Sequence, residues 1–253
     1  MSGHSKWANI KHKKGAADAK KGKVFSKIAK EITVAAKDGG DPVANLRLRQ
    51  ALDKAKAANM PSDSVDRAIK RGTGELPGVS YEHVIYECYG PAGVALLIEA
   101  LTDNKNRTTS EVRNIFSKKG GNMAGAGSVA WMFHRKGLIV VPKNTTKEDS
   151  LLTMAIEAGA EDMKTESDCY EIIIAVDSFE KVKSKLSENK IKFSSAEITM
   201  LPVSTVKLSA QTAKQVLSLV NELESHDDIQ QVHANFDIPD EILEEVTGED
   251  TGG

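Results

Sequence analysis

The side chains best suited to binding chemistry in this sequence are the lysines of its first thirty residues. Nine lysines lie between residues 6 and 30, against the single acid Asp18. Lysine ammonium groups attract phosphates and displace condensed counterions, and an aromatic side chain on an extended arm can stack on an unpaired base. We therefore predict that this stretch binds the backbone of a nucleic acid through Lys6, Trp7, Lys11, His12, Lys13, Lys14, Lys20, Lys21, Lys23, Lys27 and Lys30.

The type of cation in this stretch limits how sequence-specific such binding can be. The first arginine of the chain is Arg47, so the usual bidentate reader of guanine is missing from the arm. Recognition by backbone contacts or by shape is expected rather than a tight sequence code. A lysine-rich helix face that is merely solvated gives a similar pattern, but the density of charge and the tryptophan favour binding.

A second polar cluster occupies residues 102–113, with the sequence TDNKNRTTSEVR. At a helix N-terminus such a cluster could contact a phosphate. Asp, Asn and Thr are also ordinary N-cap residues, and capping alone is the simpler interpretation. The secondary candidates for nucleic-acid contact are Asn104, Lys105, Arg107 and Arg113.

Signatures of catalysis and of metal binding are missing from the sequence. There is no Walker loop, no zinc-protease pair of histidines, no nucleophile elbow and no paired cysteine motif. The glycine-rich stretch 120–127 follows a predicted helix and precedes a predicted strand, the reverse of a dinucleotide site, and is interpreted as a helix end plus a turn. The six histidines are not at ligand spacing. We expect no enzymatic activity, no cofactor, no metal and no small-molecule substrate.

The distribution of charge is more informative than its sum. The formal net charge is -2, yet residues 1–71 carry +10 and the remainder carries -12. One part of the chain is therefore built to approach polyanions. Cys88 and Cys169 are far apart and match no metal spacing, so buried free thiols in a reducing compartment are expected. No apolar run is long enough for a membrane span or a secretory signal, which favours the cytoplasm.

Hydrophobic spacing predicts the elements that position these residues. Apolar residues at 25, 28, 32 and 35 predict a helix over 17–37 that ends at Gly39. Asp41 as N-cap with Pro42 at the first helical position predicts a second helix to about residue 59. Ser62 as N-cap predicts a third helix that stops at Gly72. Three amphipathic helices with short links predict a small bundle.

Beyond a linker at 72–80 the pattern changes to strands. Runs at 81–89 and 93–101 predict a hairpin, followed by a helix over 107–119 and a strand over 128–134. Residues 136–202 show the order βαββαβ, which is typical of a ferredoxin-like unit. A short strand, a helix over 211–224 and a strand over 231–236 remain, too few elements to fold alone. We infer that these elements complete the sheet begun at residue 81.

The predicted fold class is therefore α+β with three domains, an N-terminal three-helix bundle plus two α+β domains, the inner one ferredoxin-like. The predicted boundaries are 1–75 for the basic helical domain with its arm, 76–135 with 203–240 for a discontinuous α+β domain, 136–202 for the inserted ferredoxin-like domain, and 241–253 for an acidic tail.

Several separate segments resemble the YebC/PmpR family of probable transcriptional regulators, which includes the mitochondrial translational activator of cytochrome c oxidase subunit I. The most specific are SGHSKWANIKHKK at 2–14, DAKKGK at 18–23 and FSKI at 25–28. Further matches are NMP at 59–61, RAIKRGTG at 67–74, YGP at 89–91, NRT at 106–108, EVR at 111–113 and GSV at 127–129. The family often has glycine where this chain has Cys88 and Ala92, and Leu-Gly where it has Met123 and Ala124. The resemblance implies a three-domain α+β protein that regulates gene expression.

By the resemblance, the expected function is that of a DNA-binding transcriptional regulator, and a ribosome-associated translation factor is the close alternative. Members of the family are described as DNA-binding regulators of transcription, and others as ribosome-associated factors that help translation through stretches such as proline runs. Duplex DNA and ribosomal RNA are both polyanions, so the lysines alone do not separate them. The acidic tail is expected to be a solubilising end; masking of the basic arm by this tail is the weaker hypothesis.

Overall fold

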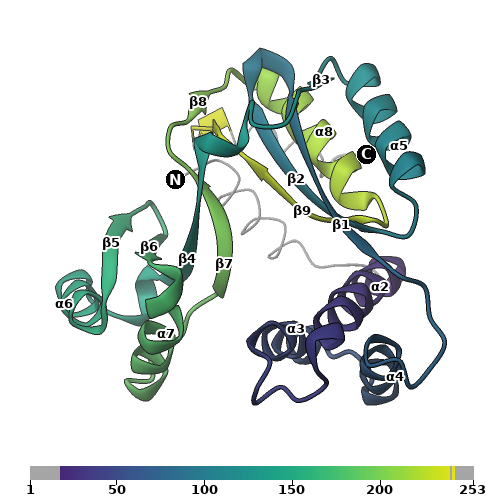
Figure 1. Ribbon diagram of the computed structural model, residues 1–253. Helices are drawn as coiled ribbons and strands as arrows, with labels where there is room; N and C mark the ends of the chain where they lie inside the picture. Colours follow the sequence, from purple (N-terminus) through teal and green to yellow (C-terminus); the bar gives the residue numbers. More distant parts are fainter. Residues whose placement is uncertain (1–17, 240, 243–253) are drawn as a thin grey trace. The chain divides into compact units, whose positions relative to one another are not determined.

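The computed structural model describes residues 18–239, 241 and 242, with side chains from residue 21 onward (Figure 1). These residues divide into two compact units. One comprises residues 18–128 with 211–232, and the other residues 129–210 with the described residues from 233 onward. Helices and antiparallel sheets occur in both, which confirms the α+β class. The boundaries predicted for the three domains stay a prediction.

Helices α2 (Asp18–Ala35), α3 (Leu46–Ala57) and α4 (Ser62–Gly72) form the bundle expected from the spacing of their apolar residues. A 3₁₀ turn, Ala36–Asp38, continues α2. The bundle has its own aliphatic core, which includes Ile32 and Leu48 among its fully buried side chains. Small alanines fill the rest of this core and allow the helices to approach closely.

The start of α3 differs from the prediction. Asn45 rather than Asp41 is the N-cap, because its Oδ1 accepts a hydrogen bond from the Leu48 N–H at 3.0 Å. The Asn45 amide also donates to the carbonyl of Ala35 at 2.8 Å and so ties α3 to the end of α2. Asp41 instead accepts from the Val43 N–H in a local turn. Asp-Pro is a turn signal as well as a helix start, and here it makes the turn. At α4 the N-cap position is Pro61, and Ser62 is the first helical residue.

The first sheet has the strand order β3-β1-β2-β9. Strands β1 (Glu82–Tyr89) and β2 (Ala95–Thr102) are the predicted antiparallel hairpin, β3 (Asn122–Met123) pairs with β1, and β9 (Ile229–Ala234) lies beside β2. Helices α5 (Lys105–Lys118) and α8 (Ala210–Ser225) cover one face of this sheet (Figure 1). Strand β9 therefore adds to the sheet begun at residue 82, whereas the short strand predicted near 205–208 pairs elsewhere.

The second sheet belongs to a ferredoxin-like unit. Its elements follow in the order β4 (Phe133–Pro142), α6 (Glu148–Ala158), β5 (Ala160–Thr165), β6 (Cys169–Ile174), α7 (Phe179–Glu188) and β7 (Ser195–Pro202). The strand order is β5-β6-β4-β7 and every pair is antiparallel, which is the topology expected of this order of elements. Both helices pack into one core with the sheet. Strands β8 (Val206–Lys207) and β10 (Phe236–Asp237) form a separate parallel pair.

The prediction of a strand over 128–134 is wrong. Residues Ala130–Met132 form a 3₁₀ turn, and β4 begins at Phe133 and continues through the strand predicted separately after residue 137. The glycine-rich stretch before it contains β3, where Met123 pairs with Cys88. Gly121 is required there, because a Cβ would lie 2.6 Å from the carbonyl oxygen of Tyr89 and 2.7 Å from the Phe116 ring. Among the helices of the described residues, none combines the length and apolar character that a membrane span requires.

Candidate nucleic-acid interface

Three of the predicted phosphate-binding lysines lie along one face of α2. Lys23, Lys27 and Lys30 are spaced by four and three residues, so their side chains project in the same direction. Lys23 Nζ donates to the carbonyl of Ser225 at 3.0 Å and Lys27 Nζ to the carbonyl of Glu224 at 2.6 Å. These carbonyls belong to the last turn of α8, where no intrahelical donor is left and the helix dipole is negative. We call Lys23, Lys27 and Lys30 the lysine face.

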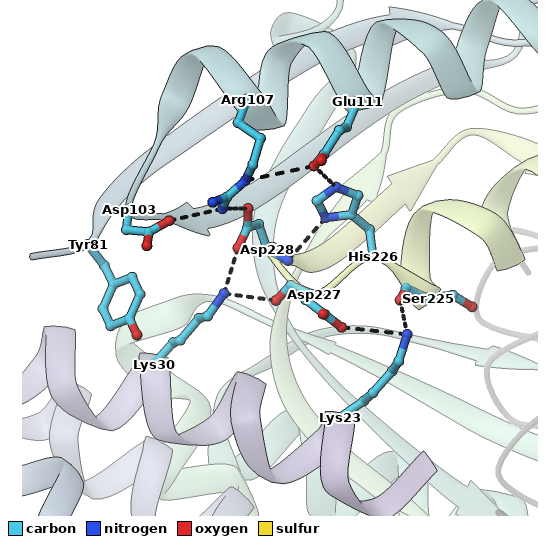
Figure 2. A pocket seen from close by; sticks show the side chains of 10 residues that line it. All are labelled: Lys23, Lys30, Tyr81, Asp103, Arg107, Glu111, Ser225, His226, Asp227 and Asp228. Atoms are coloured by element: carbon cyan, nitrogen blue, oxygen red, sulfur yellow. Dashed lines mark hydrogen bonds and ion pairs between the residues drawn. The ribbon is translucent and has the colours of Figure 1, made fainter. Parts of the chain in front are cut away.

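The chain after α8 supplies the remaining acceptors, and we call the last two residues of α8 together with this segment, residues 224–228, the acidic turn. Lys30 Nζ donates to the Asp227 carbonyl at 3.1 Å and to Asp228 Oδ1 at 2.6 Å. Lys23 also pairs with the Asp227 carboxylate at 3.5 Å. Figure 2 shows the ammonium groups of Lys23 and Lys30 pointing from α2 into the acidic turn.

Asp228 is the most heavily bonded carboxylate of the site. Its Oδ2 accepts from Arg107 Nη2 at 2.8 Å and from Thr108 Oγ1 at 2.7 Å, both in the first turn of α5. The Thr102 hydroxyl lies 3.2 Å from the same oxygen. Burial alone would raise the pKa of Asp228, but hydrogen bonds from Lys30, Arg107 and Thr108 outweigh it and hold the pKa well below its usual range.

His226 extends the network to α5. The backbone N–H of Asp228 donates to His226 Nδ1 at 3.1 Å, so the proton of the neutral ring is on Nε2, which donates to Glu111 Oε2 at 2.8 Å. Ligand atoms of Glu111, His226 and Asp228 lie within 4.8 Å of one another, close enough to hold a metal ion. A metal would have to displace the hydrogen bond of the ring nitrogen that it binds and compete with Lys30 and Arg107 for Asp228. The chemistry of this cluster is therefore that of an ion-pair network.

A cavity of about 530 Å³ opens over the network (Figure 2). Three cations and four carboxylates line it, together with His226 and the Tyr81 ring, which lies 5.5 Å from Lys30 Nζ. A lining with more carboxylates than fixed cations repels phosphate. In this conformation the cavity is therefore not an anion site, although it contains lysines predicted to contact phosphate.

The other predicted residues are distributed as follows. Lys6, Trp7, Lys11, His12, Lys13 and Lys14 lie outside the described residues, as does most of the acidic tail, and Lys20 lies on α2 with its side chain not described. Lys21 is exposed. Of the secondary candidates, Asn104 caps α5 by accepting from the Arg107 N–H at 3.1 Å. Arg107 binds Asp228 and Asp103, and Lys105 and Arg113 are exposed on α5. Side chains in the first turn of α5, where a phosphate was a candidate ligand, thus bind the carboxylate of Asp228.

Sequence reasoning missed the acidic turn. The sequence predicted a mask of the basic arm only in the acidic tail at 241–253, whereas the acceptors lie at 224–228. A weak signal was present, because two aspartates directly after a helix end are unfavourable beside the negative end of its dipole and need cations from elsewhere. It also passed over exposed cations of the bundle. Arg47, Arg49, Lys56, Lys70 and Arg71 make no ion pair with any residue that the structure describes.

Comparison with known proteins places this architecture in a family. Residues 5–75 match the TACO1/YebC protein N-terminal domain, and residues 81–236 match the TACO1/YebC second and third domain. A probable transcriptional regulatory protein of Geobacter sulfurreducens is 56% identical over 247 residues, covering 97% of this chain and 100% of that protein. One from Dictyoglomus turgidum is 54% identical over 249 residues, covering 98% and 100%. The crystal structure of a conserved hypothetical protein from Aquifex aeolicus has a TM-score of 0.79 at 48% identity, covering 89% of this chain and 94% of that one. The chain therefore belongs to the TACO1/YebC family.

Proposed function

We propose that this protein is a nucleic-acid-binding regulator of gene expression that acts in the cytoplasm by binding rather than by catalysis. Its relatives bear the name of probable transcriptional regulatory proteins, which supports the regulatory part. Duplex DNA is the proposed partner, and the lysine-rich N-terminal arm with the first part of α2 is the proposed contact. Within the arm and helix, the residues proposed to contact phosphates first are Lys13, Lys14, Lys20, Lys21 and Lys23.

The observation that carries this proposal is the behaviour of the lysine face. Its ammonium groups follow α2 over about 10 Å, since seven residues rise about 1.5 Å each. Each of the three already binds an oxygen atom of an acid-rich segment at 3.1 Å or less. A row of ammonium groups that converges on carbonyl and carboxylate oxygens has the chemistry that a phosphate backbone requires. The arm that precedes it continues the same composition.

Binding by lysines predicts a particular kind of recognition. Ammonium groups act as point charges and do not form the bidentate pairs with which arginine reads guanine. Affinity should therefore depend steeply on salt and weakly on sequence. The relevant quantities are the salt slope and the ratio of affinities for different sequences, rather than a single dissociation constant.

A ribosome-bound role in translation is the second candidate. It is favoured by the complete lack of arginine from residue 1 to 46, since duplex-DNA regulators commonly insert a recognition helix with arginine, asparagine or glutamine into the major groove. A lysine-rich arm with a stacking tryptophan suits structured RNA with unpaired bases. The positive charge of residues 1–71 is suited to duplex DNA and to ribosomal RNA alike.

Sedimentation of the purified protein with ribosomes through a sucrose cushion distinguishes the two candidates. A large excess of duplex DNA is present as competitor, at near-physiological salt. Protein that stays in the supernatant with the DNA supports the transcriptional role. Protein that pellets with ribosomes, and no longer does so when the five lysines are replaced by alanine, supports the translational role. Protein that binds neither DNA nor ribosomes contradicts the proposed function.

A further inference from the structure

We propose that the acidic turn is an internal competitor of nucleic acid for the lysine face, so that the whole lysine face binds phosphates only after α2 separates from residues 224–228. This inference rests on the proposed function, because it assumes that Lys23, Lys27 and Lys30 contact phosphates. The turn presents to α2 what a nucleic acid would present: carbonyl and carboxylate oxygens in a row, at 2.6 to 3.5 Å from the three ammonium groups.

The contacts are graded from an exposed rim to a buried anchor. At the rim, the side chains of Lys23 and Asp227 are 57% and 71% exposed. At the anchor, those of Lys30 and Asp228 are 15% and 6% exposed. A phosphate can approach Lys23 from solvent and replace a weak surface pair. It cannot reach Lys30 while Asp228 is in place. Binding along the whole lysine face therefore requires α2 to separate from the turn, not merely a rearrangement of side chains.

The apolar core of the bundle stays buried in such a separation, because residues of the bundle alone form it. The core residues of the bundle all lie between Ile28 and Ile69 and come from α2, α3, α4 and their links. Its contacts with the acidic turn are hydrogen bonds and ion pairs. Lys37 adds polar contacts to Ser80 and Tyr81, at the start of the sheet domain. Polar contacts of this kind are weakened by salt and by competing polyanions.

Asp228 is bound from two sides, so it stays attached to α5 when α2 separates from the acidic turn. Its carboxylate is bound from the α2 side by Lys30 and from the α5 side by Arg107 and Thr108. When α2 leaves, Asp228 keeps its partners on α5, so the turn retains its position. The turn is then available to recapture α2 when the nucleic acid dissociates. The closed state lowers the apparent affinity by the fraction of molecules that are open.

The test compares two double variants of the full-length chain that lose the same charge. The turn variant, Asp227→Asn with Asp228→Asn, weakens the contacts between the acidic turn and the lysine face. The control variant, Asp149→Asn with Asp177→Asn, removes two exposed carboxylates of the ferredoxin-like unit. Affinity for a fixed short duplex is measured over a series of salt concentrations. We expect the turn variant to bind on the order of tenfold tighter than the control, because apparent affinity scales with the open fraction. We expect its slope of log K against log salt to steepen by up to about 2.7, since each freed lysine adds about 0.9.

A second measurement covers the case in which the double variant folds poorly. In the wild-type protein, amide exchange at residues 224–228 should accelerate when DNA is added, and Asp227→Asn alone should bind more tightly than Asp177→Asn alone. Equal affinity and slope for the turn variant and its control, with no change in exchange, would overturn the inference. Absence of DNA binding in the wild-type protein is a different result, because it removes the proposed function itself.

Discussion

Replacing Asp228 should destabilise the protein far more than replacing its neighbour Asp227. The Asp228 side chain is 6% exposed and accepts from Lys30, Arg107 and Thr108. Breaking a buried ion pair costs about 3–5 kcal/mol, because the partner charge stays buried and unpaired. Lys30 and Arg107 are 15% and 44% exposed and regain part of their hydration. For Asp228→Asn we therefore expect a loss near the lower end, about 3 kcal/mol.

Asp227→Asn is the matched control, since it removes the same charge one residue away. Its carboxylate is 71% exposed and pairs with a lysine that is 57% exposed, so the expected loss is below about 0.5 kcal/mol. Urea unfolding gives the global free energy, and native-state exchange of the Leu101 amide gives the local one, because that amide donates to the Asp228 carbonyl at 2.8 Å. Losses for the two variants that agree within about 0.5 kcal/mol would show that Asp228 is not a buried anchor of the network.

Three further predictions concern other parts of the chain. Because the pKa of Asp228 is lowered on folding, its contribution to stability is complete above the ordinary carboxyl pKa and is lost as the pH falls toward the folded-state pKa. The difference in unfolding free energy between wild type and Asp228→Asn should therefore shrink below about pH 4. A difference that stays constant would contradict this. Ala92 has φ 57°, in the left-handed region where the family often has glycine, so Ala92→Gly should leave stability unchanged or raise it by up to about 1 kcal/mol in thermal unfolding. Burial raises the pKa of Cys88 and Cys169 to about 12, so neither thiol should react with a disulfide reagent at neutral pH until the chain is unfolded, and rapid labelling of the native protein would refute that.

Local patterns in the sequence were sufficient for most of the fold. The period of the apolar residues placed all three bundle helices, and the order βαββαβ identified the ferredoxin-like unit with its strands within a few residues. The errors lie where two local signals compete. Asp41 and Pro42 predict both a helix start and a turn, and the structure has the turn. The apolar run from 128 to 134 is typical of a strand, but it contains a 3₁₀ turn at Ala130–Met132 and β4 begins only at Phe133.

The candidate site was predictable only in part, because its main contacts join residues about 200 positions apart. The lysines of α2 are conspicuous in the sequence, and their binding to nucleic acid stays a prediction. Nothing in their spacing indicates that Lys30 pairs with Asp228, since helical periodicity reports which face a side chain occupies and not what that face meets. The polar cluster at the start of α5 was similarly visible as a capping sequence, but its anionic partner came from the far end of the chain.

The most direct test of the central claim is the salt dependence of nucleic-acid binding by the wild-type protein and by a variant with Lys13, Lys14, Lys20, Lys21 and Lys23 replaced by alanine. Affinities for a short duplex and for a ribosomal RNA fragment are measured between about 50 and 200 mM salt. We expect the variant to bind more weakly to every sequence, and its slope on duplex DNA to fall by up to about 4.5, or about 0.9 for each lost phosphate contact. An unchanged affinity and slope would show that these lysines do not bind nucleic acid, which contradicts the proposed function of the arm and α2.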